Sequence, residues 1–293
     1  MEKDCFIIAE WIDKNKKVYK MKVIDCVCFL QEIDLLKARL ELLQDAVDIT
    51  LVVESNTTFS GKPKPYNLDS RIREFDQWHE KLMYMMIDQS DSDVEIKEVS
   101  KYTPENGSWL LEHQHRNSFA LVRDIVEDDD IVLIGDLDEV PYPEAIEILK
   151  TLPDSYFPVS LNMLFHYYYV NCQNIGFERQ WNGTVAVKGK QFKEELPQTF
   201  RDGRNKYDMI ANAGNHWSFL GDADKIKNKI QSFAHTEFNK PEIISEDHIL
   251  DCIENGKDVF NRAGVSYKVV PMGTYPAAVQ KVFSKYPQFI KEV

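Results

Sequence analysis

The spacing of hydrophobic positions changes along the chain, and the first changes outline a βαβ unit. Residues 22–30 (KVIDCVCFL) are rich in β-branched and apolar residues and are bounded by polar ones, which predicts a strand. A helix is predicted over residues 32–46, where apolar side chains recur at helical spacing, at Ile33, Leu36, Leu40 and Leu43. Residues 48–55 form a nearly continuous apolar run, typical of a strand covered on both faces. Strand, helix and strand in close succession imply two parallel strands.

The alternation of strands and helices continues to residue 150. The pattern predicts a strand over 81–87, a helix over 108–126 and a strand over 130–135. A further helix begins at Pro143, where the missing N–H of proline costs nothing. The first half of the chain therefore predicts a mostly parallel central sheet with helices on both faces.

The second half has longer, aromatic-rich segments that look antiparallel. Strands are expected within 156–172, 181–192 and 212–221, and Asn182-Gly183 predicts a turn. Asp222 is placed to cap a helix that follows it. Because no linker rich in Pro, Gly or Ser separates the halves, we expect one α/β domain over residues 1–293 with a mixed sheet.

Composition and charge narrow the functional classes. The 293 residues are 43% hydrophobic, enough for a large core. Lys and Arg number 35 against 48 acids, a net charge of −13, which argues against a general nucleic-acid binder. The lysine-rich stretch 14–22 is expected to be a solvated hairpin or tail.

The cysteines and the hydropathy of the chain predict its compartment and its contact with membranes. The five cysteines form no CxxC pair, which suggests reduced thiols and a cytoplasmic protein. The sequence has no apolar run long enough to cross a membrane, and its N-terminal residues do not resemble a signal peptide. Any membrane contact is expected to be peripheral.

An acidic group follows the predicted strand at 130–135. Asp136, Asp138 and Glu139 come directly after it, with no Lys or Arg among them, and ligands bind at the carboxyl ends of parallel strands. Carboxylates held together demand a cation, and Mg²⁺ or Mn²⁺ carrying a diphosphate meets that demand. Residues 128–130, at the other end of the strand, are expected to form a solvated turn.

Two classes of reaction use such an acidic, metal-binding strand end. Aspartyl phosphatases of the haloacid-dehalogenase type carry DxDxT on their first strand, whereas here the motif lies on a later strand and lacks the Thr. Glycosyl transfer from a nucleotide sugar fits the late position and the aromatic second half better. A Mg²⁺-dependent phosphatase or phosphotransferase and a non-catalytic carbohydrate-binding protein remain as alternatives.

Six segments together carry a family resemblance. In chain order they are VESNTTFSGKPKP, WLLEHQHRN, GDLDEVP, GNHWSFLG, SFAHTEFN and ENGKDVFNR. Their set and order resemble glycosyltransferase family 17, over residues 22–265. The resemblance implies a GT-A-like fold, a UDP-sugar donor (UDP-GlcNAc), Mn²⁺ or Mg²⁺, a glycan acceptor and inversion at the anomeric carbon. Residues 1–150 would bind the nucleotide sugar and 151–293 the acceptor.

Site roles follow from the resemblance and from the chemistry. The metal ligands are expected to be Asp136, Asp138 and His216, with His235 as a weaker alternative. The residues expected to bind the donor are Glu54, Lys62 or Lys64, Arg116, Asn117 and Asp136. Glu139 is expected to support the metal site or to contact the transferred sugar, and we group it with the catalytic residues.

An inverting transferase also needs a base for the acceptor hydroxyl. The sequence does not choose among the acids of the second half, namely Glu178, Glu194, Glu195, Asp202, Asp208, Glu246 and Asp247; we favour Asp247, at the start of a predicted helix. Six aromatic residues can supply faces for sugar rings: Phe165, Tyr167, Tyr168, Tyr169, Trp181 and Trp217. Most of them are expected to be core, with at most two touching the acceptor.

Overall fold

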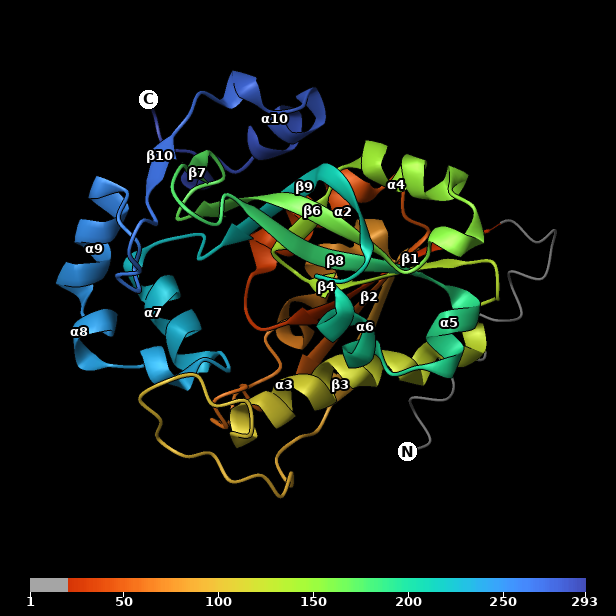
Figure 1. Ribbon diagram of the computed structural model, residues 1–293, viewed down its shortest axis with the longest axis horizontal. Helices are drawn as coiled ribbons and strands as arrows, with labels where there is room; N and C mark the ends of the chain where they lie inside the picture. The colour runs from red at the N-terminus through yellow and green to blue at the C-terminus, as the bar shows by residue number, and fades with distance from the viewer. Residues whose placement is uncertain (1–20) are drawn as a thin grey trace.

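The computed structural model describes residues 21–293 (Figure 1). Cys5 and residues 14–20 of the lysine-rich stretch lie outside this range. The strands are β1 (Val23–Phe29), β2 (Ile49–Ser55), β3 (Leu82–Ile87), β4 (Ile131–Asp136), β5 (Glu139–Pro141), β6 (Val159–Tyr167), β7 (Cys172–Asn174), β8 (Gln180–Lys188), β9 (Asp208–Ser218) and β10 (Tyr267–Val269). Within the described range they form one ten-stranded sheet, ordered β10-β7-β6-β8-β4-β1-β2-β3, with β9 paired to β5 and β6.

Helices connect these strands. The α-helices are α2 (Ile33–Leu43), α3 (Gly107–Asn117), α4 (Pro143–Thr151), α5 (Gly189–Glu194), α6 (Pro197–Gly203), α7 (Ala223–Ser232), α8 (Pro241–Ile244), α9 (Glu246–Asn255) and α10 (Ala277–Phe283). The 3₁₀ segments are η1 (Asp69–Trp78), η2 (Ser118–Ile125), η3 (Asp154–Tyr156), η4 (Thr236–Phe238), η5 (Met272–Thr274) and η6 (Pro287–Phe289).

The parallel part of the sheet matches the sequence pattern. β1 pairs in parallel with both β2 and β4, and β2 with β3. The register sets Phe29 beside Glu54 and Cys28 beside Asp136, so these strands end at one edge of the sheet. The helix predicted over 108–126 is confirmed only in part, because α3 gives way to η2 after Asn117.

The second half adds antiparallel strands to the same sheet. β8 lies antiparallel between β4 and β6, while β6 pairs in parallel with β9. The α/β class with a mixed sheet is therefore confirmed. The turn predicted at Asn182-Gly183 is wrong, since both residues lie inside β8. Gly183 provides space there, because a Cβ would lie 3.1 Å from Cδ of Glu139.

Helices cover both faces of the sheet (Figure 1). On one face, Leu36 and Leu40 of α2 and Phe283 of α10 pack with Val27 of β1, and α4 packs nearby. On the other face, η2, α5 and α6 pack on Ile134 and its neighbours. Helices α7 and α9 pack on the aromatic end of β6. The described cysteines are free, and no helix within residues 21–293 has the length and apolar character to cross a membrane.

The acidic turn before β4 differs from the expectation. Asp130 is fully buried, and its two carboxylate oxygens accept hydrogen bonds from the backbone N–H groups of Lys22 (2.7 Å) and Glu127 (2.9 Å). Only Asp128 and Asp129 are solvated, and Asp128 pairs with Lys193. Asp130 therefore anchors the start of β1 beside the start of β4.

Candidate active site

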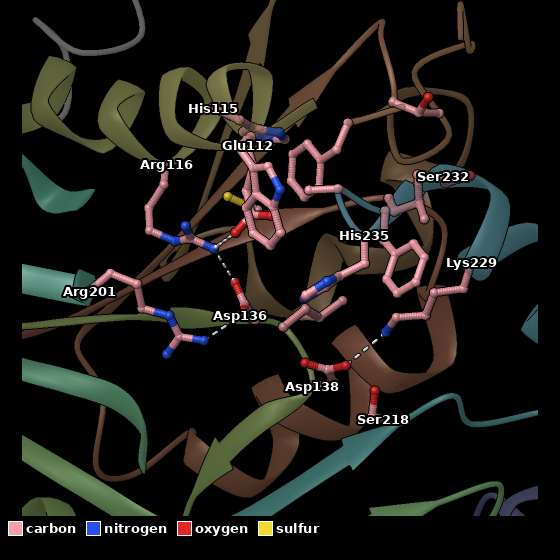
Figure 2. Close-up of a pocket in the computed structure, with 18 of the residues that line it drawn as sticks. Glu112, His115, Arg116, Asp136, Asp138, Arg201, Ser218, Lys229, Ser232 and His235 are labelled. Atoms are coloured by element: carbon pink, nitrogen blue, oxygen red, sulfur yellow. Dashed lines mark hydrogen bonds and ion pairs between the residues drawn. The ribbon is translucent and has the colours of Figure 1, made fainter. Parts of the chain in front are cut away.

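A cavity of about 910 Å³ opens where the parallel strands end. Its walls come from the β4–β5 turn, from α3 and α6, from the end of β9, and from α7 with the segment that follows it. Pockets of this size accommodate cofactor-sized ligands. Asp136, Asp138, Arg116 and Lys229 all line it (Figure 2).

Asp136 is held between two arginines. Nη2 of Arg116 lies 2.8 Å from one carboxylate oxygen, and Nη2 of Arg201 lies 2.8 Å from the other. Burial on its own would raise the pKa of Asp136, but the ion pairs with Arg201 and Arg116 outweigh it and hold that pKa well below its usual range. Arg116 also contacts Glu112 at 3.0 Å. Asp136 is therefore a charged anchor for two guanidinium groups.

Asp138 faces a different set of partners. Its Oδ2 accepts a hydrogen bond from Nζ of Lys229 at 2.7 Å, and its Oδ1 lies 3.5 Å from Nε2 of His216. Burial opposes ionisation, yet Lys229 and His216 keep the pKa of Asp138 far below its usual value. Lys229 also pairs with Glu32 at 3.1 Å, so one ammonium serves two carboxylates.

Glu139 is fully buried and does not line the cavity, although the sequence placed it in the catalytic group. Its carboxylate receives a bidentate pair from Arg201 (2.5 and 2.8 Å) and a hydrogen bond from Nε1 of Trp181 (2.6 Å). As the first residue of β5, it turns its side chain over Gly183 of β8. Glu139 therefore positions Arg201 and Trp181 from behind the site.

Arg39 supports the acidic turn from α2. Its guanidinium pairs with both carboxylate oxygens of Asp25 (2.7 and 2.8 Å) and donates to the carbonyls of Asp136, Leu137 and Glu139. Both members of the pair are buried. This contact was not predicted from the sequence. The available signal was an arginine among the leucines of a helix and an aspartate inside an apolar strand.

The structure does not bring every predicted donor residue to the cavity. Glu54 is buried and holds the loop after β2, through Lys64 (2.5 Å), two backbone N–H groups and the hydroxyl of Tyr84. Lys62 is exposed outside the cavity, whereas Lys64 lines it. Asn117 accepts a hydrogen bond from the backbone N–H of Gln198 and so ties α3 to α6.

Asp247, the favoured base, lies outside the cavity. It is exposed in the first turn of α9, because that helix packs inward through Ile249 and Cys252. A base must touch the acceptor hydroxyl, so this geometry does not support Asp247. Of the other acids weighed, only Glu178 and Asp202 line the cavity; Glu194, Glu195, Asp208 and Glu246 do not.

The aromatic residues divide between core and cavity. Phe165, Tyr167 and Trp181 line the cavity, whereas Tyr168 and Trp217 are buried in the core and Tyr169 lies outside the lining. Phe165 stacks on the imidazole of His216, with ring centroids 4.7 Å apart. These three rings form a wall beside Asp138.

Two cations of the site were not found from the sequence. Arg201 lies on α6, a helix too short for a readable period, and Lys229 belongs to a lysine-rich helix that resembles a solvated face. The signal for Lys229 was its place beside Ile226 and Ile230, which are both buried.

A known protein family matches nearly the whole chain. The sequence model of glycosyltransferase family 17 matches residues 1–284. The chain belongs to glycosyltransferase family 17. The family assignment confirms the resemblance carried by the six segments.

The relatives are similar over part of their length. The β-1,4-mannosyl-glycoprotein 4-β-N-acetylglucosaminyltransferases of Rattus norvegicus and Homo sapiens are each 26% identical over 176 residues. The alignments cover 57% of this chain and 29% of each relative, so the chain matches under a third of their length. The apo-form glycosyltransferase GlyE of Streptococcus pneumoniae TIGR4 aligns at 11% identity over 66% of this chain and 46% of its own, with a TM-score of 0.33. A TM-score this low does not establish a shared architecture.

Proposed function

We propose that this family 17 chain transfers N-acetylglucosamine from UDP-GlcNAc to a hydroxyl of a glycan, with inversion at the anomeric carbon. One observation carries the proposal: three cationic side chains, Arg116, Arg201 and Lys229, surround the Asp136–Asp138 pair inside a cavity of about 910 Å³. The names of the relatives support the sugar and the class of acceptor.

The charges suit a diphosphate leaving group. Negative charge develops on that group as its bond to the sugar breaks, and cations fixed nearby stabilise it. Lys229 lines the cavity and is shared by Asp138 and Glu32, which raise its pKa against the opposing effect of burial. It therefore stays charged and can turn toward a phosphate oxygen. Arg116 presents a second charge from α3 (Figure 2).

The side chains that could ligate a metal in this site fit a divalent cation in part. Within residues 21–293 no group of three or more His, Cys, Asp or Glu side chains is arranged to hold a metal. Mg²⁺ and Mn²⁺ in nucleotide sites, however, need only one or two protein ligands beside phosphate oxygens. Oδ1 of Asp138 and Nε2 of His216, 3.5 Å apart, supply such a pair.

Asp136 does not fit as a direct ligand, because each of its oxygens is held by an arginine. A cation at Asp138 and His216 would help to neutralise the diphosphate. Asp136 would act on the donor through Arg116 and Arg201.

The test measures turnover of UDP-GlcNAc with Mn²⁺, as release of UDP and as transfer to a panel of p-nitrophenyl glycosides. Asp138→Asn should lower both by at least about 100-fold while the variant keeps its fold, because the group that holds Lys229 and the cation is lost. EDTA should have the same effect on the wild type. Asp45→Asn, the same change at an exposed position after α2, is the matched control.

Other outcomes separate the alternatives. Full activity of Asp138→Asn, or activity undiminished by EDTA, contradicts the metal role. Release of phosphate from p-nitrophenyl phosphate, with no response to nucleotide sugars, establishes a phosphatase. Glycan binding without any donor turnover establishes a carbohydrate-binding protein.

A further inference from the structure

A histidine–glutamate pair lies on the cavity wall after α7. Nδ1 of His235 is 2.8 Å from Oε1 of Glu237. The His235 side chain is 42% exposed and lines the cavity, whereas the Glu237 side chain is 7% exposed. In Figure 2 the imidazole of His235 points into the cavity. We propose that His235 is the base that deprotonates the acceptor, with Glu237 as its positioning residue; this rests on the proposed function.

The hydrogen bond assigns the tautomer of His235. A carboxylate oxygen only accepts, so Nδ1 must carry the proton that is shared with Glu237. In the neutral imidazole Nε2 then has a free lone pair, and within residues 21–293 no hydrogen bond occupies it. An imidazole oriented in this way by a buried carboxylate is the arrangement that activates hydroxyl groups in nucleophilic enzymes.

The pair is built into the wall. The ring of Trp109 packs edge-on against His235, with centroids 4.7 Å apart and planes at 84°. Ser108 donates a hydrogen bond to the carbonyl of Ala234 (2.9 Å), and Asn106 donates one to Thr236 (3.1 Å). These contacts tie the segment carrying the pair to α3 and to the residue before it, which fixes the imidazole.

Glu237 has the environment of a functional carboxylate. Its second oxygen, Oε2, is buried and has no hydrogen-bond partner among residues 21–293. Burying a carboxylate with so few partners is unfavourable for the fold. The hydrogen bond to His235 places the negative charge of Glu237 beside the imidazole. There it stabilises the protonated ring that forms during the reaction.

The acids of the cavity are less suited to take a proton. Asp136 and Asp138 are bound to arginine and lysine, and Glu178 pairs with Arg262 at 3.0 Å. Such cations stabilise the ionised form and weaken a carboxylate as a base. Asp202 is exposed and accepts a hydrogen bond from Gln198.

The other histidines of the cavity lack this arrangement. Nε2 of His115 donates to the carbonyl of Val53, and burial lowers the pKa of His115 to about 4. His216 turns Nε2 toward Asp138. His113 has no carboxylate partner among residues 21–293. His235 therefore combines an exposed lone pair with an orienting carboxylate.

In the proposed step one C–O bond forms at the donor sugar as another breaks. The acceptor O–H gives its proton to Nε2 of His235 while its oxygen forms a bond to C1 of the donor sugar. The bond from C1 to the diphosphate oxygen breaks, and its electron pair leaves with UDP. The imidazolium then releases its proton to water. When water is the acceptor, the same step gives free GlcNAc and UDP.

The experiment compares His235→Gln with wild type, using UDP-GlcNAc, Mn²⁺ and the p-nitrophenyl glycoside panel. We expect kcat for UDP release to fall by at least about 100-fold, the usual contribution of a general base. Binding of UDP, measured by thermal shift, should be unchanged. His79→Gln, the same change at an exposed site outside the cavity, is the control. Glu237→Gln should lower kcat about 10-fold with an unchanged KM for the donor.

The outcomes distinguish failure of the base assignment from failure of the proposed function. Turnover by His235→Gln within about threefold of wild type overturns the base assignment while the proposed function stands. Loss of UDP binding together with turnover makes His235 a donor contact and also overturns it. A wild type that turns over no nucleotide sugar contradicts the proposed function itself. If His235→Gln is unstable, His235→Ala with added imidazole replaces it: recovery of turnover supports the base, and no recovery contradicts it.

Discussion

The role of each acidic residue is set by its immediate partners rather than by its place in the motif. Asp136 and Asp138 are two residues apart, yet one holds arginines and the other holds a lysine and faces a histidine. The sequence found both acids, because they follow an apolar strand. It could not find two of their cationic partners, since Arg201 and Lys229 lie 65 and 91 residues away in the chain.

Two buried histidines give a prediction about acid stability. Burial lowers the pKa of His115 from 6.5 to about 4 and that of His166 to about 3. Between pH 6.5 and 4 the unfolded chain therefore binds protons that the folded protein does not. The free energy of unfolding should be highest above pH 6.5 and should fall as the pH drops, by about 1.4 kcal/mol per pH unit for each histidine.

Urea unfolding at pH 7 and pH 5 measures this dependence. His115→Gln should remove about half of the fall, whatever its effect on stability at pH 7. Equal unfolding free energies for the wild type at both pH values would contradict the prediction.

Secondary-structure elements deliver the site residues to one edge of the sheet. The long elements β1, α2, β2 and β4 were predictable because each has enough residues to show a period. The short ones were not: β5 has three residues and α6 has seven, yet they carry Glu139 and Arg201. The error at Asn182-Gly183 has a different cause: the local sequence favours a turn, but Gly183 is needed inside β8 because Glu139 packs against it.

Helix α2 fixes the acidic turn through Arg39, which gives a prediction at the scale of elements. Arg39→Met should lower the free energy of unfolding by about 3–5 kcal/mol, because Asp25 is left buried without its partner. The double variant Arg39→Met/Asp25→Leu removes both charges and should recover part of that loss. Urea denaturation measures both, and a loss below about 1 kcal/mol for the single variant would contradict the role given to Arg39.

On the scale of the whole molecule, one sheet brings strands of both halves around one cavity. The net charge of −13 gives no hint of this site, where cations gather around Asp136 and Asp138. Family membership was predictable because the six segments are spread over most of the chain.

The most direct test of the account is the thermal stability of the protein with UDP-GlcNAc, with and without Mn²⁺. A ligand that binds the folded state raises the melting temperature by mass action. We predict a clear rise with UDP-GlcNAc or UDP when Mn²⁺ is present, a smaller rise without it, and none with inorganic phosphate at the same concentration. A melting temperature that no nucleotide or nucleotide sugar changes, with or without Mn²⁺, would contradict the assignment of this cavity to a nucleotide-sugar donor.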